Sequence, residues 1–234
     1  MRKNKKNLVE LEKLLNVNFT NILLLNEALT HSSYINEDKN SIHYERLEFL
    51  GDSVLQLTIS EYLYKNCNEK SEGELTKTRS LIVCENSLHQ IAKTLDLGKY
   101  LNMSKGEELT GGRERVSILA DCVEAIIAAI YLDKGFDSAK EFILNKFEEI
   151  IKKALANEII LDYKTRLQEI LQKDGEVSIV YNLIKYEGPP HHRKFFTQVV
   201  VNNKPISSGS GYSKKESEQA AAKEVLITLE DINE

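Results

Sequence analysis

Four acidic residues of this 234-residue chain are spaced so that each pair shares one face of a helix. Glu48 and Asp52 lie four positions apart, and Asp121 and Glu124 lie three positions apart, in segments rich in apolar residues. Like charges at this spacing destabilise a helix, and a buried carboxylate is costly unless it is paired or binds a metal. Glu45 precedes Glu48 by three positions and can join the first pair. The pattern therefore favours a cation between the two segments.

A ligand set of carboxylates alone, with no His or Cys among the ligands, suits hard divalent ions, so the pattern indicates Mg²⁺, for which Mn²⁺ can substitute. Such ions favour phosphoryl chemistry, because they lower the pKa of water and stabilise charge on phosphate oxygens. The alternative is two helices with solvated acidic faces, since charged residues are mostly exposed. Against it, the segment from Val116 to Leu132 is apolar almost all round, which predicts burial on most sides.

The first two-thirds of the chain reads as a succession of helices. Apolar residues recur at helical spacing in residues 8–15, 22–29, 47–64, 75–95, 118–132 and 139–155. Ser71 and Glu74 have the spacing of a capping box, which predicts a helix start. Gly51 lies inside the helix of Glu48 and Asp52, where a glycine costs about 1 kcal/mol relative to alanine. Close approach of another helix or of a substrate would explain it.

The pattern changes near residue 156, where we place a domain boundary. An amphipathic helix is expected first, then β-branched and aromatic alternation predicts three strands, and a capping box of Ser213 and Glu216 predicts a final helix. These elements are expected at residues 162–173, 177–186, 195–201, 205–208 and 213–229. The predicted fold class is an all-α N-terminal domain, residues 1–156, followed by a small α+β domain of α-β-β-β-α order, residues 157–234.

Positive charge is concentrated in one part of the second domain. The chain has a net charge of −5, and residues 157–234 hold 10 Lys and Arg against 12 Asp and Glu, so overall charge argues against nucleic acid. Between residues 185 and 215, however, the sequence has six basic residues and one acidic residue, Glu187. Lys214 and Lys215 follow the expected N-cap Ser213, and a helix N-terminus with lysines suits a phosphate. The alternative is that Lys214 and Lys215 are only solvated surface residues, as an isolated lysine pair would be.

The motifs of the first domain, taken in order, resemble those of bacterial ribonuclease III. They are His31-Ser32-Ser33, Glu45 to Leu55 (ERLEFLGDSVL), Glu72-Gly73, Gly111-Gly112-Arg113 and Ile118 to Ala125 (ILADCVEA). The resemblance implies a helical endonuclease domain in which Glu48, Asp121 and Glu124 bind the metal. It implies catalytic roles for Asp52 and Glu124. Glu45 and Glu72 match acidic positions near the cleavage groove. Two departures, Tyr44 for a common Asn and Cys122 for a small or apolar residue, leave every carboxylate in place.

The second domain resembles the double-stranded-RNA-binding domain of the same family. The resemblance places minor-groove contacts at Thr165 and Gln168 and a sugar contact at His191. Arg193 lies in the same loop, and Lys214 and Lys215 match phosphate contacts. Such a surface reads the shape of an A-form duplex and its 2′-hydroxyls rather than its sequence.

The resemblance implies an Mg²⁺-dependent endoribonuclease that cuts double-stranded RNA into 5′-phosphate and 3′-hydroxyl ends with short 3′ overhangs. It also implies a homodimer through the N-terminal domain, and processing of ribosomal-RNA precursors and some messenger RNAs in a bacterial cytoplasm. The three cysteines are odd in number and far apart, which suggests reduced thiols. No stretch is apolar and long enough to predict a membrane span.

Two other functions stay open. A duplex-RNA-binding protein whose nuclease domain serves only for dimerisation would lack at least one of the four carboxylates, yet all four are present. A metal–carboxylate hydrolase of small phosphorylated substrates would keep its activity without residues 157–234 and would ignore duplex length.

Overall fold

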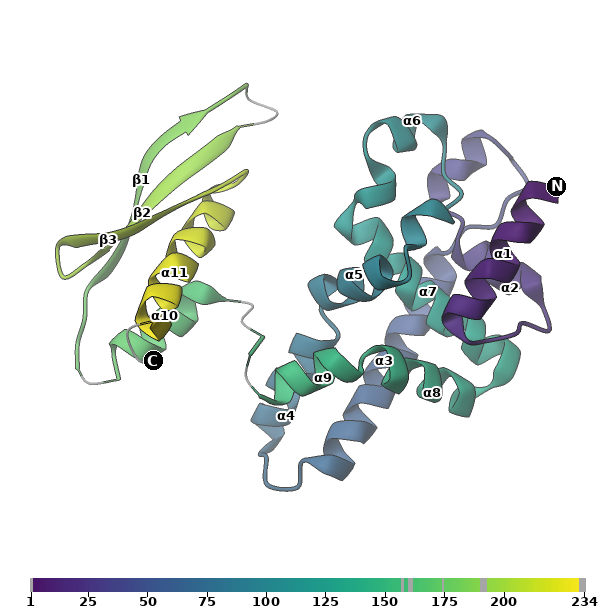
Figure 1. Cartoon of the computed structure of the whole chain (residues 1–234), viewed down its shortest axis with the longest axis horizontal. Coiled ribbons are helices and arrows are strands. Elements are labelled where there is room, and N and C mark those ends of the chain that lie inside the picture. The colour runs from purple at the N-terminus through teal and green to yellow at the C-terminus, as the bar shows by residue number, and fades with distance from the viewer. Residues whose placement is uncertain (1, 157, 160–161, 174, 190–192, 232–234) are drawn as a thin grey trace. The chain divides into compact units, whose positions relative to one another are not determined.

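The computed structural model describes residues 2–156, 158–159, 162–173, 175–189 and 193–231 (Figure 1). Contacts within the chain divide it into two compact units, Met1–Ile159 and Ile160–Glu234. The first unit is helical, and the second consists of a helix, three strands and a helix, which is the predicted fold class. Within the described residues, no helix is long and apolar enough to cross a membrane.

The helical unit contains nine α-helices and three short 3₁₀ helices (η) among its described residues. They are α1 (Arg2–Leu15), α2 (Ile22–Ala28), η1 (Ser32–Asn36), α3 (Glu45–Asn66), α4 (Glu72–Ile82), α5 (Glu85–Thr94), η2 (Leu97–Lys99), α6 (Lys105–Leu109), η3 (Gly112–Glu114), α7 (Val116–Lys134), α8 (Phe136–Lys146) and α9 (Glu148–Leu155). The predicted capping box is present at the start of α4, where Ser71 and Glu74 bond to each other's backbone N–H groups.

Helix α7 is the centre of the helical core. Eleven of its residues between Ile118 and Ile130 are buried, as its apolar sequence predicts. Helix α3 packs along it, and α2, α5 and α8 also contact it. Asp121 and Glu124 are half-buried exceptions on this apolar helix. Their position on the central helix explains why carboxylates are held inside the unit.

Two segments that read as single helices are each divided in the structure. Helix α4 ends at Ile82 before α5 begins at Glu85, and α8 ends at Lys146 before α9 begins at Glu148. At the first junction, the hydroxyl of Ser87 donates a hydrogen bond of 2.8 Å to the carbonyl oxygen of Leu81. Both halves of each segment bury apolar residues in the same core, so the apolar spacing continues across the turn and hides it.

The second unit is built on an antiparallel sheet in the order β1-β2-β3. Its elements are α10 (Tyr163–Leu171), β1 (Ile179–Glu187), β2 (Lys194–Val201), β3 (Lys204–Gly211) and α11 (Lys214–Asp231). Asn202 and Asn203 both have positive φ and close a two-residue hairpin turn between β2 and β3. Helix α11 lies against the sheet (Figure 1), and a Cβ on Gly209 would lie 2.1 Å from the backbone nitrogen of Ala221.

Candidate active site and nucleic-acid interface

The four carboxylates lie where α3 and α7 approach each other most closely. A Cβ built on Gly51 of α3 would lie 1.8 Å from the backbone oxygen of Glu124 on α7, so a side chain at this position would collide with the helix. Gly51 immediately precedes Asp52 and follows Glu48 by three residues. The contact therefore brings the α3 pair beside the α7 pair, and it explains Gly51 by the approach of another helix.

Burial and mutual repulsion shift the acidities of this carboxylate cluster (Glu48, Asp52, Asp121 and Glu124). Burial, followed by the negative charges of Asp52, Glu48 and Asp121, raises the pKa of Glu124 to about 8. Burial also raises the pKa of Glu48, with further contributions from Asp121, Glu45 and Asp52. The pKa of Asp121 is raised mainly by burial, although a hydrogen bond from Tyr44 opposes the shift. Burial is the largest cause of each shift, and the neighbouring carboxylates add to it.

The hydrogen-bond donors that reach the cluster are neutral. The Gln56 amide nitrogen lies 3.0 and 3.3 Å from the two carboxylate oxygens of Asp52. The buried Tyr44 donates its hydroxyl to Asp121 Oδ2 over 3.5 Å, and burial raises the pKa of that tyrosine. In the described part of the chain, no Lys or Arg forms an ion pair with any of the four carboxylates. No basic side chain of the described residues therefore balances the negative charge of the cluster.

The donor chemistry of the cluster fits a hard divalent cation, because the ligands are carboxylate oxygens from two rigid helices. As the side chains stand, no group of three or more His, Cys, Asp or Glu among the described residues converges closely enough to hold a metal ion. The carboxylates repel one another, as their effect on the pKa of Glu124 indicates. A divalent cation would replace the repulsion by attraction, so small side-chain rotations toward it are favourable.

Glu45 and Glu72, the two predicted acidic residues outside the cluster, lie in different places. Glu45, on the first turn of α3, is exposed, lies 3.7 Å from His43 Nδ1 and adds negative charge to the surroundings of Glu48 and Asp121. Glu72, on the first turn of α4, lines another groove together with Leu57. Its carboxylate accepts a hydrogen bond of 3.0 Å from the hydroxyl of Thr76. The helical unit therefore brings Glu45, but not Glu72, to the rim of the cluster.

Sequence reasoning missed Glu85, Tyr44 and Gln56 as neighbours of the cluster. Glu85, at the start of α5, is close enough to raise the pKa of Asp121. Its position follows from the packing of α5 against α7, which no spacing within one segment encodes. Gln56 could have been found, because it follows Asp52 by four residues on the same helix face.

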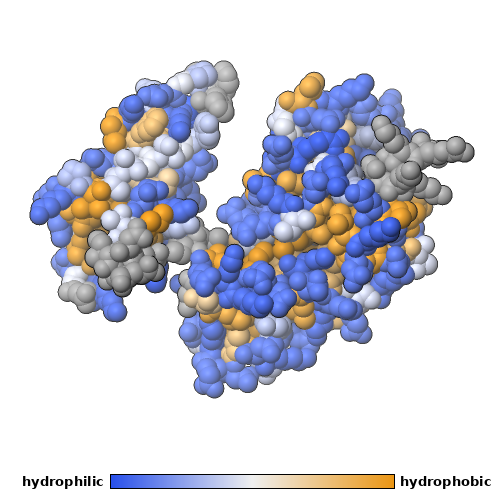
Figure 2. All heavy atoms as spheres, in the orientation of Figure 1, coloured by the Kyte–Doolittle hydropathy of each residue, from blue (hydrophilic) through white to orange (hydrophobic). Residues whose placement is uncertain are grey.

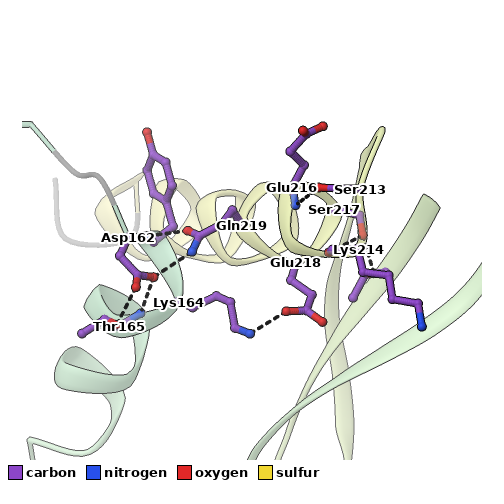
Figure 3. A network of polar contacts seen from close by, with 11 residues as sticks. Asp162, Lys164, Thr165, Ser213, Lys214, Glu216, Ser217, Glu218 and Gln219 are labelled. Carbon is purple, nitrogen blue, oxygen red and sulfur yellow. Dashed lines mark hydrogen bonds and ion pairs between the residues drawn. The ribbon is translucent and has the colours of Figure 1, made fainter. Parts of the chain in front are cut away.

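On the second unit, Thr165 and Gln168 lie on the exposed side of α10. They line one pocket together with Lys215 and Gln219 of α11. Figure 3 shows Asp162 joining the two helices: its Oδ1 accepts a hydrogen bond of 2.8 Å from the Gln219 amide, and its Oδ2 one of 2.9 Å from the Thr165 hydroxyl. The structure thus brings three of the predicted RNA contacts onto one surface.

The predicted cap of the last helix differs in one bond. The hydroxyl of Ser213 accepts from the backbone N–H of Glu216 at 3.1 Å, whereas the Glu216 carboxylate accepts from Tyr212, one residue earlier than in a capping box. Lys214 and Lys215 follow on the first turn and are exposed. Neither forms an ion pair with a described residue, so both charges remain available to a phosphate.

Two predicted contacts lie before β2. The half-buried Arg193 holds its guanidinium 4.5 Å from the ring centroid of Tyr186, a cation–π contact within the unit. His191 lies outside the described residues.

Lys164 of α10 makes a second cation–π contact, with its ammonium 4.5 Å from the ring centroid of Tyr181. The same lysine is ion-paired with Glu218 at 2.6 Å.

Family models match both units. Residues 21–152 match the model described as "Ribonuclease-III-like", and residues 163–229 match the "Double-stranded RNA binding motif". The first match spans the helices that carry the carboxylate cluster. The second spans α10 to α11 and includes every proposed RNA contact of the second unit.

Relatives of similar length agree with these matches. The chain is 63% identical to "Ribonuclease 3" of Clostridium perfringens, over 97% of this chain and 95% of the relative. It is 64% identical to "Ribonuclease 3" of Clostridium beijerinckii, over 99% of this chain and 100% of the relative. The solved nuclease domain of ribonuclease III from Campylobacter jejuni superposes with a TM-score of 0.58 at 46% identity, covering 62% of this chain and 95% of that domain.

The agreement extends over both units and nearly the whole length of these relatives. A carboxylate cluster on a helical nuclease unit and a separate unit for duplex RNA are the parts that such an activity requires. The chain therefore belongs to the ribonuclease III family and is an endoribonuclease that binds double-stranded RNA.

Proposed function

We propose that this endoribonuclease uses Mg²⁺, with Mn²⁺ able to replace it, to hydrolyse phosphodiester bonds of double-stranded RNA. Residues 1–156 form the catalytic and dimerisation domain, and residues 157–234 hold the duplex. The observation that carries the proposal is the contact of α3 with α7 at Gly51, which brings Glu48 and Asp52 beside Asp121 and Glu124. Burial and the three neighbouring carboxylates raise the pKa of Glu124 to about 8. A divalent cation is the partner that would stabilise this carboxylate as an anion at neutral pH.

Glu48, Asp121 and Glu124 would hold the ion, and Asp52 and Glu124 are the catalytic residues. When bound, Mg²⁺ supplies positive charge that lowers the pKa of water and stabilises negative charge on the phosphate and the leaving oxygen. Asp52 accepts hydrogen bonds from Gln56 and orients the attacking water. The water oxygen loses a proton and bonds to phosphorus as the bond from phosphorus to the 3′-oxygen breaks, and the leaving 3′-oxygen takes up a proton. The products are a 5′-phosphate and a 3′-hydroxyl.

Contacts of the second unit position the duplex. Thr165, Gln168 and His191 contact the minor groove, while Arg193, Lys214 and Lys215 contact phosphates. Exposure of Lys214 and Lys215 at the N-terminus of α11 supports the phosphate role. Glu45, at the rim of the cluster, would lie along the groove through which RNA passes, and Glu72 would contact RNA from the separate groove that it lines together with Leu57. Because such contacts are made to sugars and phosphates, they position the duplex without reading bases.

A homodimer through the helical unit is supported by an apolar stripe on α3. Phe49, Leu57 and Tyr64 follow each other at intervals of eight and seven residues, so they share one side of the helix. Their exposed fractions are 79, 58 and 73%. Figure 2 shows hydrophobic residues reaching the surface of the helical unit. Pairing of two copies would bury such a stripe and place two catalytic sites on one duplex, which would give short 3′ overhangs.

The natural substrates are proposed to be ribosomal-RNA precursors and some messenger RNAs in a bacterial cytoplasm. Free cysteines support a reducing compartment: Cys67 and Cys84 are half-buried, and Cys122 is buried. Both relatives compared are bacterial ribonucleases.

The test of catalysis is cleavage of an end-labelled RNA duplex by the wild type, by Glu124→Gln, and by the wild type with a chelator. The matching DNA duplex is the substrate control. We expect Mg²⁺-dependent cutting of RNA alone, ligatable 5′-phosphate ends, and a loss of at least about 100-fold in Glu124→Gln while RNA binding persists. Cutting in the presence of chelator would contradict the metal dependence. Binding of RNA without cutting by the wild type would contradict the catalytic role of the carboxylate cluster.

The test of dimerisation is light scattering on Leu57→Glu, with Leu109→Glu as the matched control. Leu109 is 88% exposed at the end of α6 and is not part of the α3 stripe. We expect the wild type and Leu109→Glu to be dimers and Leu57→Glu to dissociate, because a charge in an apolar interface is costly. A monomeric wild type would contradict the proposal.

A further inference from the structure

Gln56 stands out among the side chains that touch the carboxylate cluster. Its amide nitrogen lies 3.0 Å from Oδ1 and 3.3 Å from Oδ2 of Asp52, so it contacts both carboxylate oxygens. Both residues are half-buried on α3. The carboxylate of Asp52 is therefore restrained in rotation by one donor group that spans it.

The turn that carries Gln56 is itself held in place. The hydroxyl of Ser60 donates a hydrogen bond of 2.6 Å to the backbone oxygen of Gln56. Arg79 of α4 donates in turn to the Ser60 hydroxyl at 2.8 Å. The row of Asp52, Gln56 and Ser60 thus runs along one face of α3, and its far end is anchored to a second helix.

The donor to Asp52 is neutral, which matters for a site that collects cations. A lysine four residues after Asp52 would pair with it and would stabilise the helix. It would also cancel charge that a cation needs. An amide orients the carboxylate without adding a positive charge beside it, and the charge of Asp52 also acts on Glu124.

We propose that Gln56 is a positioning residue of the nuclease: it holds Asp52, which orients the water beside the ion and adds negative charge to the cluster, and it thereby raises the affinity of the cluster for its divalent ion. This inference rests on the proposed metal dependence. The hydrogen-bond partner of a metal-ligating side chain commonly contributes 10-fold to 100-fold in metal affinity or activity, and Asp52 acts on the ligand Glu124 through its charge. Nothing in the spacing of the acidic residues reveals this role, because it depends on a side chain that carries no charge.

The experiment measures Mn²⁺ binding to the full-length protein without RNA, from the free Mn²⁺ signal in electron paramagnetic resonance. Gln56→Met keeps the side-chain length and removes the donor. Gln90→Met makes the same chemical change at an exposed position on α5. We expect the dissociation constant for Mn²⁺ to rise about 10-fold in Gln56→Met and to stay at the wild-type value in Gln90→Met.

Gln56→Lys separates positioning from stability. It is expected to keep or raise the melting temperature, because it relieves like-charge repulsion on α3, while it weakens Mn²⁺ binding more than Gln56→Met does. In cleavage assays at saturating RNA, Gln56→Met should need about 10-fold more Mg²⁺ for half-maximal rate and recover most of the wild-type kcat at high Mg²⁺.

Wild-type Mn²⁺ affinity and an unchanged Mg²⁺ midpoint in Gln56→Met would overturn the proposal and leave Gln56 as a helix-stabilising partner of Asp52. A wild type that binds no Mn²⁺ and cuts RNA in chelator would instead overturn the metal dependence on which the proposal rests. The two failures are distinguishable, because only the second appears in the wild type.

Discussion

At the scale of single residues, Glu124 combines burial of a carboxyl group with the proximity of like charges, and both are unfavourable for a stable fold. It is half-buried, and it faces three other carboxylates without an ion-pairing base among the described residues. The unfolded chain has no such environment, so its Glu124 titrates near the usual value for a glutamate. The difference in pKa between the two states links stability to pH.

Glu124→Gln should therefore change the pH dependence of stability in the presence of chelator. The folded pKa of about 8 lies above the unfolded value, so the wild-type fold binds an extra proton at mildly acidic pH and loses that stabilisation as pH rises to about 8. Glutamine does not ionise, so the stability of Glu124→Gln does not fall in this way as pH rises. We expect the variant to gain at least about 1 kcal/mol relative to the wild type between pH 6 and pH 9, since one pKa unit corresponds to about that energy.

Chemical denaturation at several pH values measures this difference, with Glu45→Gln on the exposed rim of the cluster as the control. Parallel stability curves for the wild type and Glu124→Gln would contradict the electrostatic account of the cluster.

At the scale of elements, the site exists because α3 and α7 touch at a glycine. Gly51→Ala would place a methyl group 1.8 Å from the backbone oxygen of Glu124. Backbone cannot yield as a flexible side chain does, so the helices must separate. We expect a loss of at least about 3 kcal/mol in the free energy of unfolding, or failure to fold.

Gly73→Ala is the matched control for Gly51→Ala, because a Cβ on Gly73 of α4 meets nothing within 4 Å. It should stabilise the helix by about 0.5 to 1 kcal/mol. Circular dichroism during urea denaturation distinguishes the two variants. If both substitutions changed the free energy of unfolding equally, the close contact between α3 and α7 at Gly51 would be contradicted.

In the second unit, Asp162 joins α10 to α11. Hydrogen bonds from the Gln219 amide and from the backbone of Thr165 lower the pKa of Asp162 to about 2. A lowered folded pKa means that the stabilisation is present above the unfolded value near 4 and is lost as pH falls toward 2. Asp162→Ala should destabilise this unit by about 1 kcal/mol at pH 7, the usual effect of losing an N-cap.

The difference between the wild type and Asp162→Ala should shrink as pH is lowered from 5 to 2.5. Glu224→Ala, at an exposed position of α11, should change stability little at either pH. Urea denaturation followed by a signal from the second unit measures both. A constant difference across this range would mean that the charge of Asp162 plays no part.

At the scale of the whole molecule, an acidic chain binds a polyanion through a local concentration of positive charge. The net charge is −5, yet Lys214 and Lys215 are exposed and unpaired with respect to the described residues. Replacing both with Ala should weaken binding of any RNA duplex, whatever its sequence, and reduce the slope of log K against log salt by about 2.

Lys152→Ala with Lys153→Ala is the matched control, since this adjacent pair lies on α9 and Lys152 is ion-paired with Glu148 and Glu149. Filter binding at several salt concentrations gives the slopes. Loss of affinity with an unchanged salt slope would mean that Lys214 and Lys215 do not contact phosphates.

The helical character of the first unit and the order helix, three strands, helix of the second could be predicted from the chain itself. The local signals are strong: Ser71 and Glu74 form their capping box, and α7 is buried almost all round. The breaks at Ile82 and Lys146 could not be predicted, because the apolar spacing continues across them.

Residue types and their spacing along the chain determined which side chains share a helix face, since the geometry of a helix is local. Only the tertiary structure decided which faces meet. It placed Gly51 against Glu124, brought Glu85 near Asp121 and left Glu72 in another groove. The pKa of Glu124 is likewise a tertiary property, because burial and charges from a second helix produce it, and packing between distant segments is not encoded in local periodicity.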